Sequence, residues 1–264
     1  MDDNRWVLVY LTLIVCAALL ALLVYRYDMY EREPWYMLVA MAVLGAGAMW
    51  LVGKAEMLTL QQFSEPWPAP LIAIVASTHE EAARLILVAA LALLVPHQFN
   101  DPMDGIIYGS IVGLGMAVEE SIGNSDLIYP NATFLPPTEI IRLAGHLVLG
   151  GITTFAIGMA RMRIKRWGLA LAGCVAFTLA WHFLWDWMAF AVAEAGSMRR
   201  WQTAGAVALM LAGMMVYGML VVVGSDWSGR IFQPHTPREL WGWPFDLIVG
   251  KIGTKRRAAA SESD

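Results

Sequence analysis

The sequence predicts an all-α protein, a polytopic membrane bundle of about seven transmembrane helices. Of the 264 residues, 58% are hydrophobic and only 15% are charged, whereas soluble domains average about 45–50% apolar and about 25% charged residues. The apolar residues gather in seven stretches, each close to the roughly 20 residues that a membrane-spanning helix needs. One helical bundle, rather than two soluble domains, therefore accounts best for the length of the chain.

The expected spans follow one another along most of the chain. The first begins at Trp6 and is too long for the apolar core of a signal peptide, so we expect it to be a retained helix. The last is almost uninterrupted apolar sequence and is expected to be purely structural. The seven spans cover residues 6–26, 35–53, 69–95, 104–124, 140–160, 167–190 and 201–224.

The domain organisation expected from this pattern is one bundle over residues 1–225, followed by a tail. Residues 226–264 contain prolines, three tryptophans and a basic run, which predicts an interfacial and then disordered cytoplasmic segment. The two cysteines, Cys16 and Cys174, lie inside apolar stretches and have neither metal-type spacing nor a disulfide pattern. We expect both to be small buried hydrophobic residues.

Lysine and arginine residues predict the orientation in the membrane, because they accumulate in cytoplasmic loops. Four of them lie in the loop at 161–166, two in the loop at 26–34, and six in the tail after residue 229. An odd number of spans places all three segments on one side. We therefore expect the N-terminus outside and the C-terminus in the cytoplasm.

Two adjacent carboxylates, Glu80 and Glu81, stand at the middle of the third apolar stretch. A charge at the membrane centre costs about 2.5–3.5 kcal/mol on insertion scales, so such residues usually mark a functional site. Arg84 follows four and three positions later, which places it beside both carboxylates on one helix face. His79-Glu80 does not begin the zinc motif H-E-x-x-H, because Ala83 stands where its second histidine would be.

The fourth stretch begins with an aspartate and proline pattern at 101–104 that is typical of a helix start. Small residues then recur, which predicts a face that packs closely against another helix. Glu119 and Glu120 stand at the far end of the stretch, where a solvated position near the outer interface is the alternative to a place in the site. The glycines of the expected packing face are Gly105, Gly109, Gly113 and Gly115.

Histidines mark the fifth and sixth stretches. Arg142 and His146 are four residues apart, as are His182 and Asp186. The spacing lets Asp186 accept a ring proton of His182 and so fix the tautomer of that histidine.

Polar residues on four expected helices suggest one shared wet cavity. In such a cavity a glutamate can act as a general base on water and a histidine can donate to a developing oxyanion. The same groups could instead hold a divalent metal, such as zinc, that activates water. The candidate metal ligands are Glu80, Glu81, Glu120, His146 and His182.

Two other functions use similar residues. Paired glutamates and histidines also form proton relays in coupled transporters and channels, although the chain shows no internal repeat of the kind common in transporters. A non-catalytic membrane scaffold that binds a partner helix through its glycine face is the second alternative. We expect a membrane-anchored protein and the lipid bilayer as partners, and no nucleic acid.

Several motifs resemble those of the PrsW family of bacterial intramembrane proteases. The resemblance covers about residues 20–190 and rests on Glu80-Glu81-Ala-Ala-Arg84, on Asp-Gly-Ile-Ile-Tyr-Gly at 104–109 and on the acidic segment at 28–34. The positions of His146 and of His182-x-x-x-Asp186 are also similar to those of the CAAX prenyl protease superfamily. The chain departs from the family pattern at Arg84, where a lysine is usual, and at Ser121, where an asparagine is usual.

The resemblance implies an intramembrane endopeptidase that cleaves a membrane-anchored protein, such as a single-span anti-sigma factor. It implies catalytic roles for Glu80 as the base that activates water, for Glu81 beside it, and for His146 and His182. By the same analogy His182 and Asp186 stabilise the oxyanion, while PrsW proteins have also been classed as metalloproteases. Supporting roles fall to Arg84, Glu120, Arg142 and Asp186.

Overall fold

Seven long helices form the computed structural model of the chain, which describes residues 4–127, 132–195 and 200–232. The described residues contain no strand, so the predicted all-α bundle is confirmed. A short 3₁₀ helix, η1 (Pro96–Gln98), joins the third and fourth long helices. The long helices are α1 (Asn4–Tyr27), α2 (Trp35–Leu60), α3 (Ala69–Leu94), α4 (Asp104–Leu127), α5 (Pro137–Arg161), α6 (Trp167–Ala195) and α7 (Arg200–Ile231).

Prolines set the start of three helices. Pro34 precedes α2 in an extended conformation, and prolines occupy the first turns of α3 and α5. Proline suits these positions because its fixed φ fits the first turn and its missing N–H would have no partner there. The last helix, α7, continues past residue 225 to Ile231. The rest of the expected tail, residues 233–264, lies outside the described residues.

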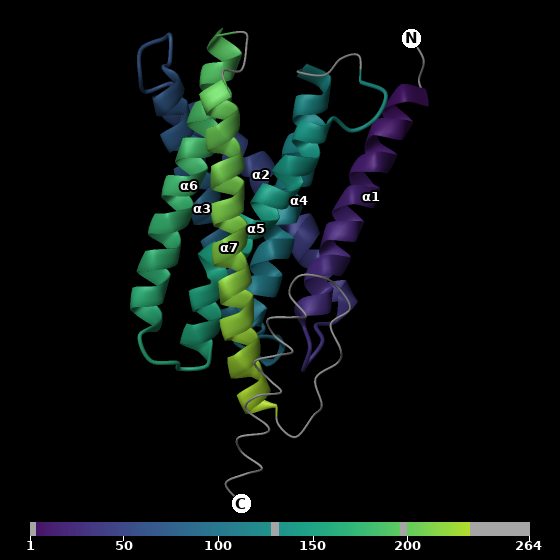
Figure 1. Ribbon diagram of the computed structural model, residues 1–264, viewed down its shortest axis with the longest axis vertical. Coiled ribbons are helices and arrows are strands. Elements are labelled where there is room, and N and C mark those ends of the chain that lie inside the picture. Colours follow the sequence, from purple (N-terminus) through teal and green to yellow (C-terminus); the bar gives the residue numbers. More distant parts are fainter. Residues whose placement is uncertain (1–3, 128–131, 196–199, 233–264) are drawn as a thin grey trace, which may run out of the picture.

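Six of the helices are long and apolar enough to cross a membrane. The remaining long helix is α3, which has 26 residues but carries Glu80, Glu81 and Arg84 near its middle. These charges lower its hydropathy without shortening it. All seven helices run along the same bundle (Figure 1), so α3 fits as the seventh span despite its charges.

The central element of the bundle is α4. It packs against α5, α2, α1 and α3, and α1 lies at one edge of the bundle and α6 near the other (Figure 1). Buried residues of α4 contribute to all three hydrophobic clusters of the core, among them Ile106, Tyr108 and Leu114. In α1, α2, α6 and α7 no more than 22% of the apolar span is buried, as expected for helices that face lipid.

Glycines allow the backbones of α4 and α5 to touch. A Cβ atom on Gly105, Gly109 or Gly113 would collide with backbone atoms of α5. The packing face predicted from the sequence is therefore present, with one difference. Gly115 faces the backbone of Ala42 in α2 instead, because a step of two residues turns it to another side of the helix.

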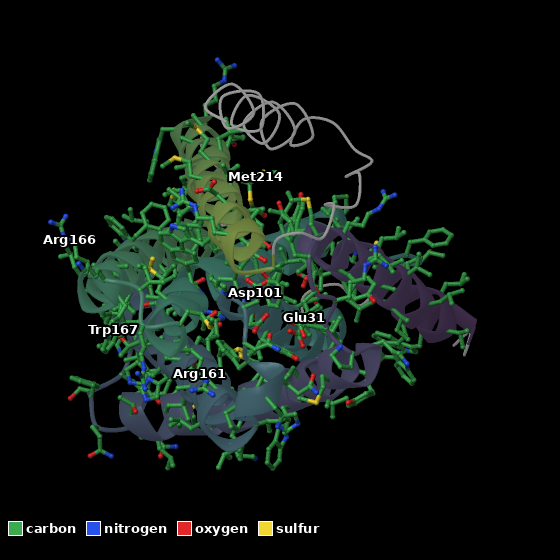
Figure 2. The ribbon with its side chains drawn as sticks, turned by 90° about the horizontal axis from the view of Figure 1, so that it is seen from below. Glu31, Asp101, Arg161, Arg166, Trp167 and Met214 are labelled. Carbon is green, nitrogen blue, oxygen red and sulfur yellow. The ribbon has the colours of Figure 1, made fainter. Side chains whose placement is uncertain are left out.

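A second polar cluster lies at the end of the bundle where α7 ends. We call Asp28, Glu33, Asp101 and Asp104, all of them buried, the acidic cluster. Figure 2 views this end, with the labelled Asp101 near its middle and Glu31 close by. The cluster joins the connection between α1 and α2 to the start of α4.

Hydrogen bonds account for much of this cluster. Asp28 accepts the backbone N–H of Glu33 at 2.6 Å, and Asp104 accepts that of Asp101 at 2.7 Å. The Tyr108 hydroxyl donates to Glu33, and the Ser228 hydroxyl of α7 donates to Asp101. The acidic cluster therefore fixes how the α1–α2 connection, α4 and α7 meet.

Burial changes the ionisation of these groups. It raises the pKa of Asp28 from 3.8 to about 8, and that of Asp101 from 3.8 to about 6. The folded chain then binds protons that the unfolded chain has already released, so folding becomes less favourable as the pH rises. For Asp28 the loss extends from about pH 4 to about pH 8.

We predict that Asp28→Asn flattens this pH dependence. The amide oxygen can still accept the Glu33 N–H but cannot ionise. In thermal unfolding of detergent-solubilised protein, the wild type should lose more stability between pH 6 and pH 8.5 than the variant. The exposed Glu65→Gln serves as control and should keep the wild-type slope. Equal slopes in Asp28→Asn and wild type would contradict the role of Asp28.

We also predict that Gly109→Ala separates α4 from α5. Its added methyl group would meet the Thr154 side chain and the Gly150 carbonyl, whereas a Cβ on Gly47 of α2 meets nothing within 4 Å. Overpacking typically costs about 1–3 kcal/mol, so Gly109→Ala should unfold at a lower temperature than wild type. Gly47→Ala, the matched control, should be unchanged or more stable. The idea fails if both variants unfold alike.

Candidate active site

Three side chains from three helices meet inside the bundle. Glu80 of α3, His146 of α5 and His182 of α6 are all buried, and one ligand atom of each lies within 4.8 Å of those of the other two. The Glu80 Oε2 atom lies 3.7 Å from His146 Nδ1 and 3.7 Å from His182 Nε2. The two imidazole rings meet edge to face with centroids 5.7 Å apart. We call these three residues the central triad.

Arg84 is completely buried and contacts two members of the central triad. Its Nη2 atom donates to Glu80 Oε2 at 3.0 Å and to His146 Nδ1 at 2.8 Å, while Nη1 donates to Glu81. The pairing with both carboxylates follows from the helical spacing of four and three residues. One guanidinium thus neutralises part of the charge of two buried carboxylates and also reaches across to α5.

Glu81 is held by donors from three helices. Its Oε1 atom accepts Arg84 and the Nδ1–H of His182, which lies at 2.9 Å. Its Oε2 atom accepts the hydroxyl of Thr153 in α5 at 2.5 Å. Because its oxygens are occupied in this way, Glu81 is suited to orienting His182 rather than to binding water.

His182 has a different main partner from the one that the sequence suggested. Its Nδ1 atom bonds to Glu81, whereas Asp186 lies 3.4 Å from the opposite ring atom, Nε2. The expectation that Asp186 fixes the tautomer is therefore corrected, because Glu81 of α3 comes closer to the ring than the residue one turn along α6. The Nε2 edge of His182 is left facing Glu80 and Asp186.

A second chain of contacts supports His146. Its Nε2 atom lies 3.2 Å from Glu120 Oε2 of α4, and Glu120 accepts Arg142 of α5. Arg142 Nε in turn lies 3.0 Å from Glu139, which also accepts the Ser121 hydroxyl at 2.8 Å. Glu120 is therefore part of the polar network rather than a separate solvated helix end.

The structure brings together every candidate site residue of the sequence analysis. Glu80 lies beside His146 and His182, whose rings contact each other, and Glu81 bonds to His182. Arg84, Glu120, Arg142 and Asp186 each contact at least one of these four residues or a direct partner of one. What each contributes to catalysis remains a proposal. The sequence analysis did not name three further residues: Thr153, Glu139 and Glu56.

Helical spacing could have indicated two of these residues. Thr153 stands seven residues after His146, and Glu139 stands three before Arg142, so both share that face of α5. Glu56 of α2 interacts electrostatically with Glu80 and Asp186, and its Oε1 atom is buried without a hydrogen-bond partner among the described residues. No spacing within α2 links Glu56 to the other helices.

Comparison with known protein families identifies the family of the chain. The profile described as PrsW family intramembrane metalloprotease matches residues 33–223, from the α1–α2 connection to α7. The chain belongs to the PrsW family. It is therefore an intramembrane peptidase with a membrane-protein substrate. Searches among curated proteins and among solved structures found no significant match.

The central triad fits the metal that the PrsW family name implies. One carboxylate and two imidazoles form a donor set known from catalytic zinc sites. Ring atoms that do not face the centre contact Glu81 and Glu120, and carboxylate partners of this kind orient metal-binding histidines. His146 Nδ1 accepts a hydrogen bond from Arg84, so a metal bound at that atom would replace this hydrogen bond.

Proposed function

We propose that this PrsW family member hydrolyses a peptide bond of a membrane-anchored protein, with Glu80 activating the attacking water. The central triad supports the proposal most directly. Its three atoms surround a point inside the membrane span where Glu80 Oε2 faces two imidazole nitrogens at 3.7 Å. In this proposal the attacking water binds beside these atoms, within hydrogen-bond reach of a base and of two polar groups.

In the proposed step, Glu80 takes a proton from water while the water oxygen attacks the peptide carbonyl carbon. The proton then passes to the leaving nitrogen, as the bond between carbon and nitrogen breaks. His146 helps to place the water. In the alternative mechanism, Glu80, His146 and His182 would hold a divalent metal, which when bound would polarise the carbonyl and acidify the water.

His182 is suited to stabilising the oxyanion. Because Nδ1 is bonded to Glu81, the Nε2 edge is the one presented to the centre of the site. As an imidazolium, the ring would donate from Nε2 to the developing negative charge. Asp186, 3.4 Å from Nε2, supports that protonated form.

We propose a single-span regulator, such as an anti-sigma factor, as the substrate, and regulated proteolysis in a bacterial cytoplasmic membrane as the process. Membership of the PrsW family and a site buried within a helical bundle support both proposals. Substrates can be trapped with Glu80→Gln, which keeps the shape of the side chain but removes its basic oxygen. Mass spectrometry of the captured membrane proteins then supplies the substrate for the assays below.

The orientation that we propose places the C-terminus in the cytoplasm. The basic loop between α5 and α6 and the end of α7 lie at the same end of the bundle (Figure 1). Arginine and lysine residues at that end favour the cytoplasmic side.

We predict that a reporter fused after Arg166 reads cytoplasmic and that one fused after Phe134 reads external. An alkaline phosphatase and a fluorescent protein, each fused at both positions, give opposite signals on the two sides. The reverse pattern at either position would overturn the proposed orientation.

We predict that Glu80→Gln nearly abolishes cleavage of a captured substrate. General-base catalysis typically contributes about 10²–10⁴-fold, so kcat should fall within that range while expression and membrane insertion persist. His182→Ala should cost as much, and Asp186→Asn less, because an amide oxygen can still accept from the ring. Glu119→Gln, the same change on a residue without a hydrogen bond to the triad among the described residues, is the matched control.

The same assay separates the two mechanisms. Loss of cleavage in excess chelator and its recovery with a divalent ion would establish the metal mechanism; normal cleavage in chelator would leave the glutamate base alone. If Glu80→Gln and Glu81→Gln both retain full cleavage, the peptidase proposal built on this pair is wrong. Ion flux through reconstituted liposomes would then be the next measurement.

A further inference from the structure

Thr153 is a buried residue of α5 that takes no part in the proposed hydrolysis step. Its hydroxyl lies 2.5 Å from Glu81 Oε2 and 2.9 Å from the carbonyl of Leu149, one turn back along the helix. A hydroxyl has one proton to give. A carboxylate is a stronger acceptor than a backbone carbonyl, so we assign the proton to the contact with Glu81.

Two other buried threonines show what a structural hydroxyl does in this bundle. Thr154 donates to the carbonyls of Gly150 and Gly105, and Thr178 donates to those of Cys174 and Val175. Three of these four carbonyls lie one turn back along the same helix, where threonine hydroxyls ordinarily bond, and the fourth, that of Gly105, is a backbone carbonyl of α4. Of these three residues, Thr153 alone reaches a charged side chain.

The contact joins three helices at one carboxylate. Arg84 donates to Glu81 from the same helix, His182 from α6, and Thr153 from α5. Arg84 and His182 both donate to Oε1 of Glu81. Among the described residues, Thr153 is the donor to Oε2. Without it the carboxylate could rotate about its last bond, and the Oε1 atom that orients His182 would lose its fixed position.

We propose that Thr153 is a positioning residue, which locks the Glu81 carboxylate and through it the orientation of the His182 ring. Its effect on cleavage rests on the proposed function; its effect on His182 does not. With Thr153, three donors hold the Glu81 carboxylate, two at Oε1 and one at Oε2. The two adjacent glutamates thus separate into one that is fixed and one, Glu80, that faces the centre.

The first test measures cleavage by Thr153→Val, which keeps the shape and loses the hydroxyl. Partners at this distance from a reacting centre typically contribute about 10–100-fold, so kcat should fall in that range with little change in KM. Thr153→Ser should restore most of the rate. Thr178→Val removes a hydroxyl that bonds only to its own helix and should behave as wild type.

The second test observes His182 directly, by NMR of protein labelled with ¹⁵N-histidine, which has only five histidines to assign. Wild type, Thr153→Ser and Thr178→Val should show a downfield Nδ1–H resonance for His182 that Thr153→Val weakens or shifts. If Thr153→Val does not give monodisperse protein, Thr153→Ala removes the same hydroxyl. An unchanged resonance in the hydroxyl-free variant overturns the proposal.

The two tests also separate the two proposals. If the wild type cleaves no captured substrate, the proposed function fails while the resonance still decides the role of Thr153. If the wild type cleaves and Thr153→Val cleaves equally fast with an unchanged His182 signal, only the inference about Thr153 fails.

Discussion

A buried guanidinium makes the rest of this site possible. Two carboxylates inside a membrane span are costly unless they are paired, and Arg84 contacts both Glu80 and Glu81 while reaching His146. The planar fork of arginine suits three acceptors in different directions, whereas the compact ammonium of lysine presents one point charge. The arginine at a position where PrsW proteins usually carry lysine therefore preserves the charge and also gives direct contacts to three site residues.

The second departure from the family pattern has a local explanation as well. The Ser121 hydroxyl donates to Glu139, and Glu139 contacts the arginine that holds Glu120 beside His146. A short polar side chain is enough to make this bond. The support of His146 thus reaches from α4 through the first turns of α5, and Ser121 is part of it rather than a substitution without consequence.

The sequence was sufficient to predict the helices and most of the polar residues, because both depend on local patterns. Apolar stretches of membrane length identified the spans, and helical spacing paired Arg84 with its two glutamates. Contacts between helices were less predictable. The main partner of His182 is Glu81 and not Asp186, and Thr153 and Glu56 also interact with the site. These contacts depend on how each helix is rotated and how far it is shifted along the bundle. Spacing within one helix carries no information on either. Gly115 was misplaced for the same reason.

The backbone contact between α4 and α5 also decides how the reactants can arrive. At Gly113 there is no room for even one methyl group beside the His146 carbonyl, so this seam is dry and closed to a water molecule. Exposure of the polar side chains rises in another direction, from 5% at Glu80 to 17% at Asp186 and 24% at Glu120. In the proposed hydrolysis, water would therefore enter on the side of Glu120 and Asp186, where the carboxylates are more exposed, and not through the glycine seam.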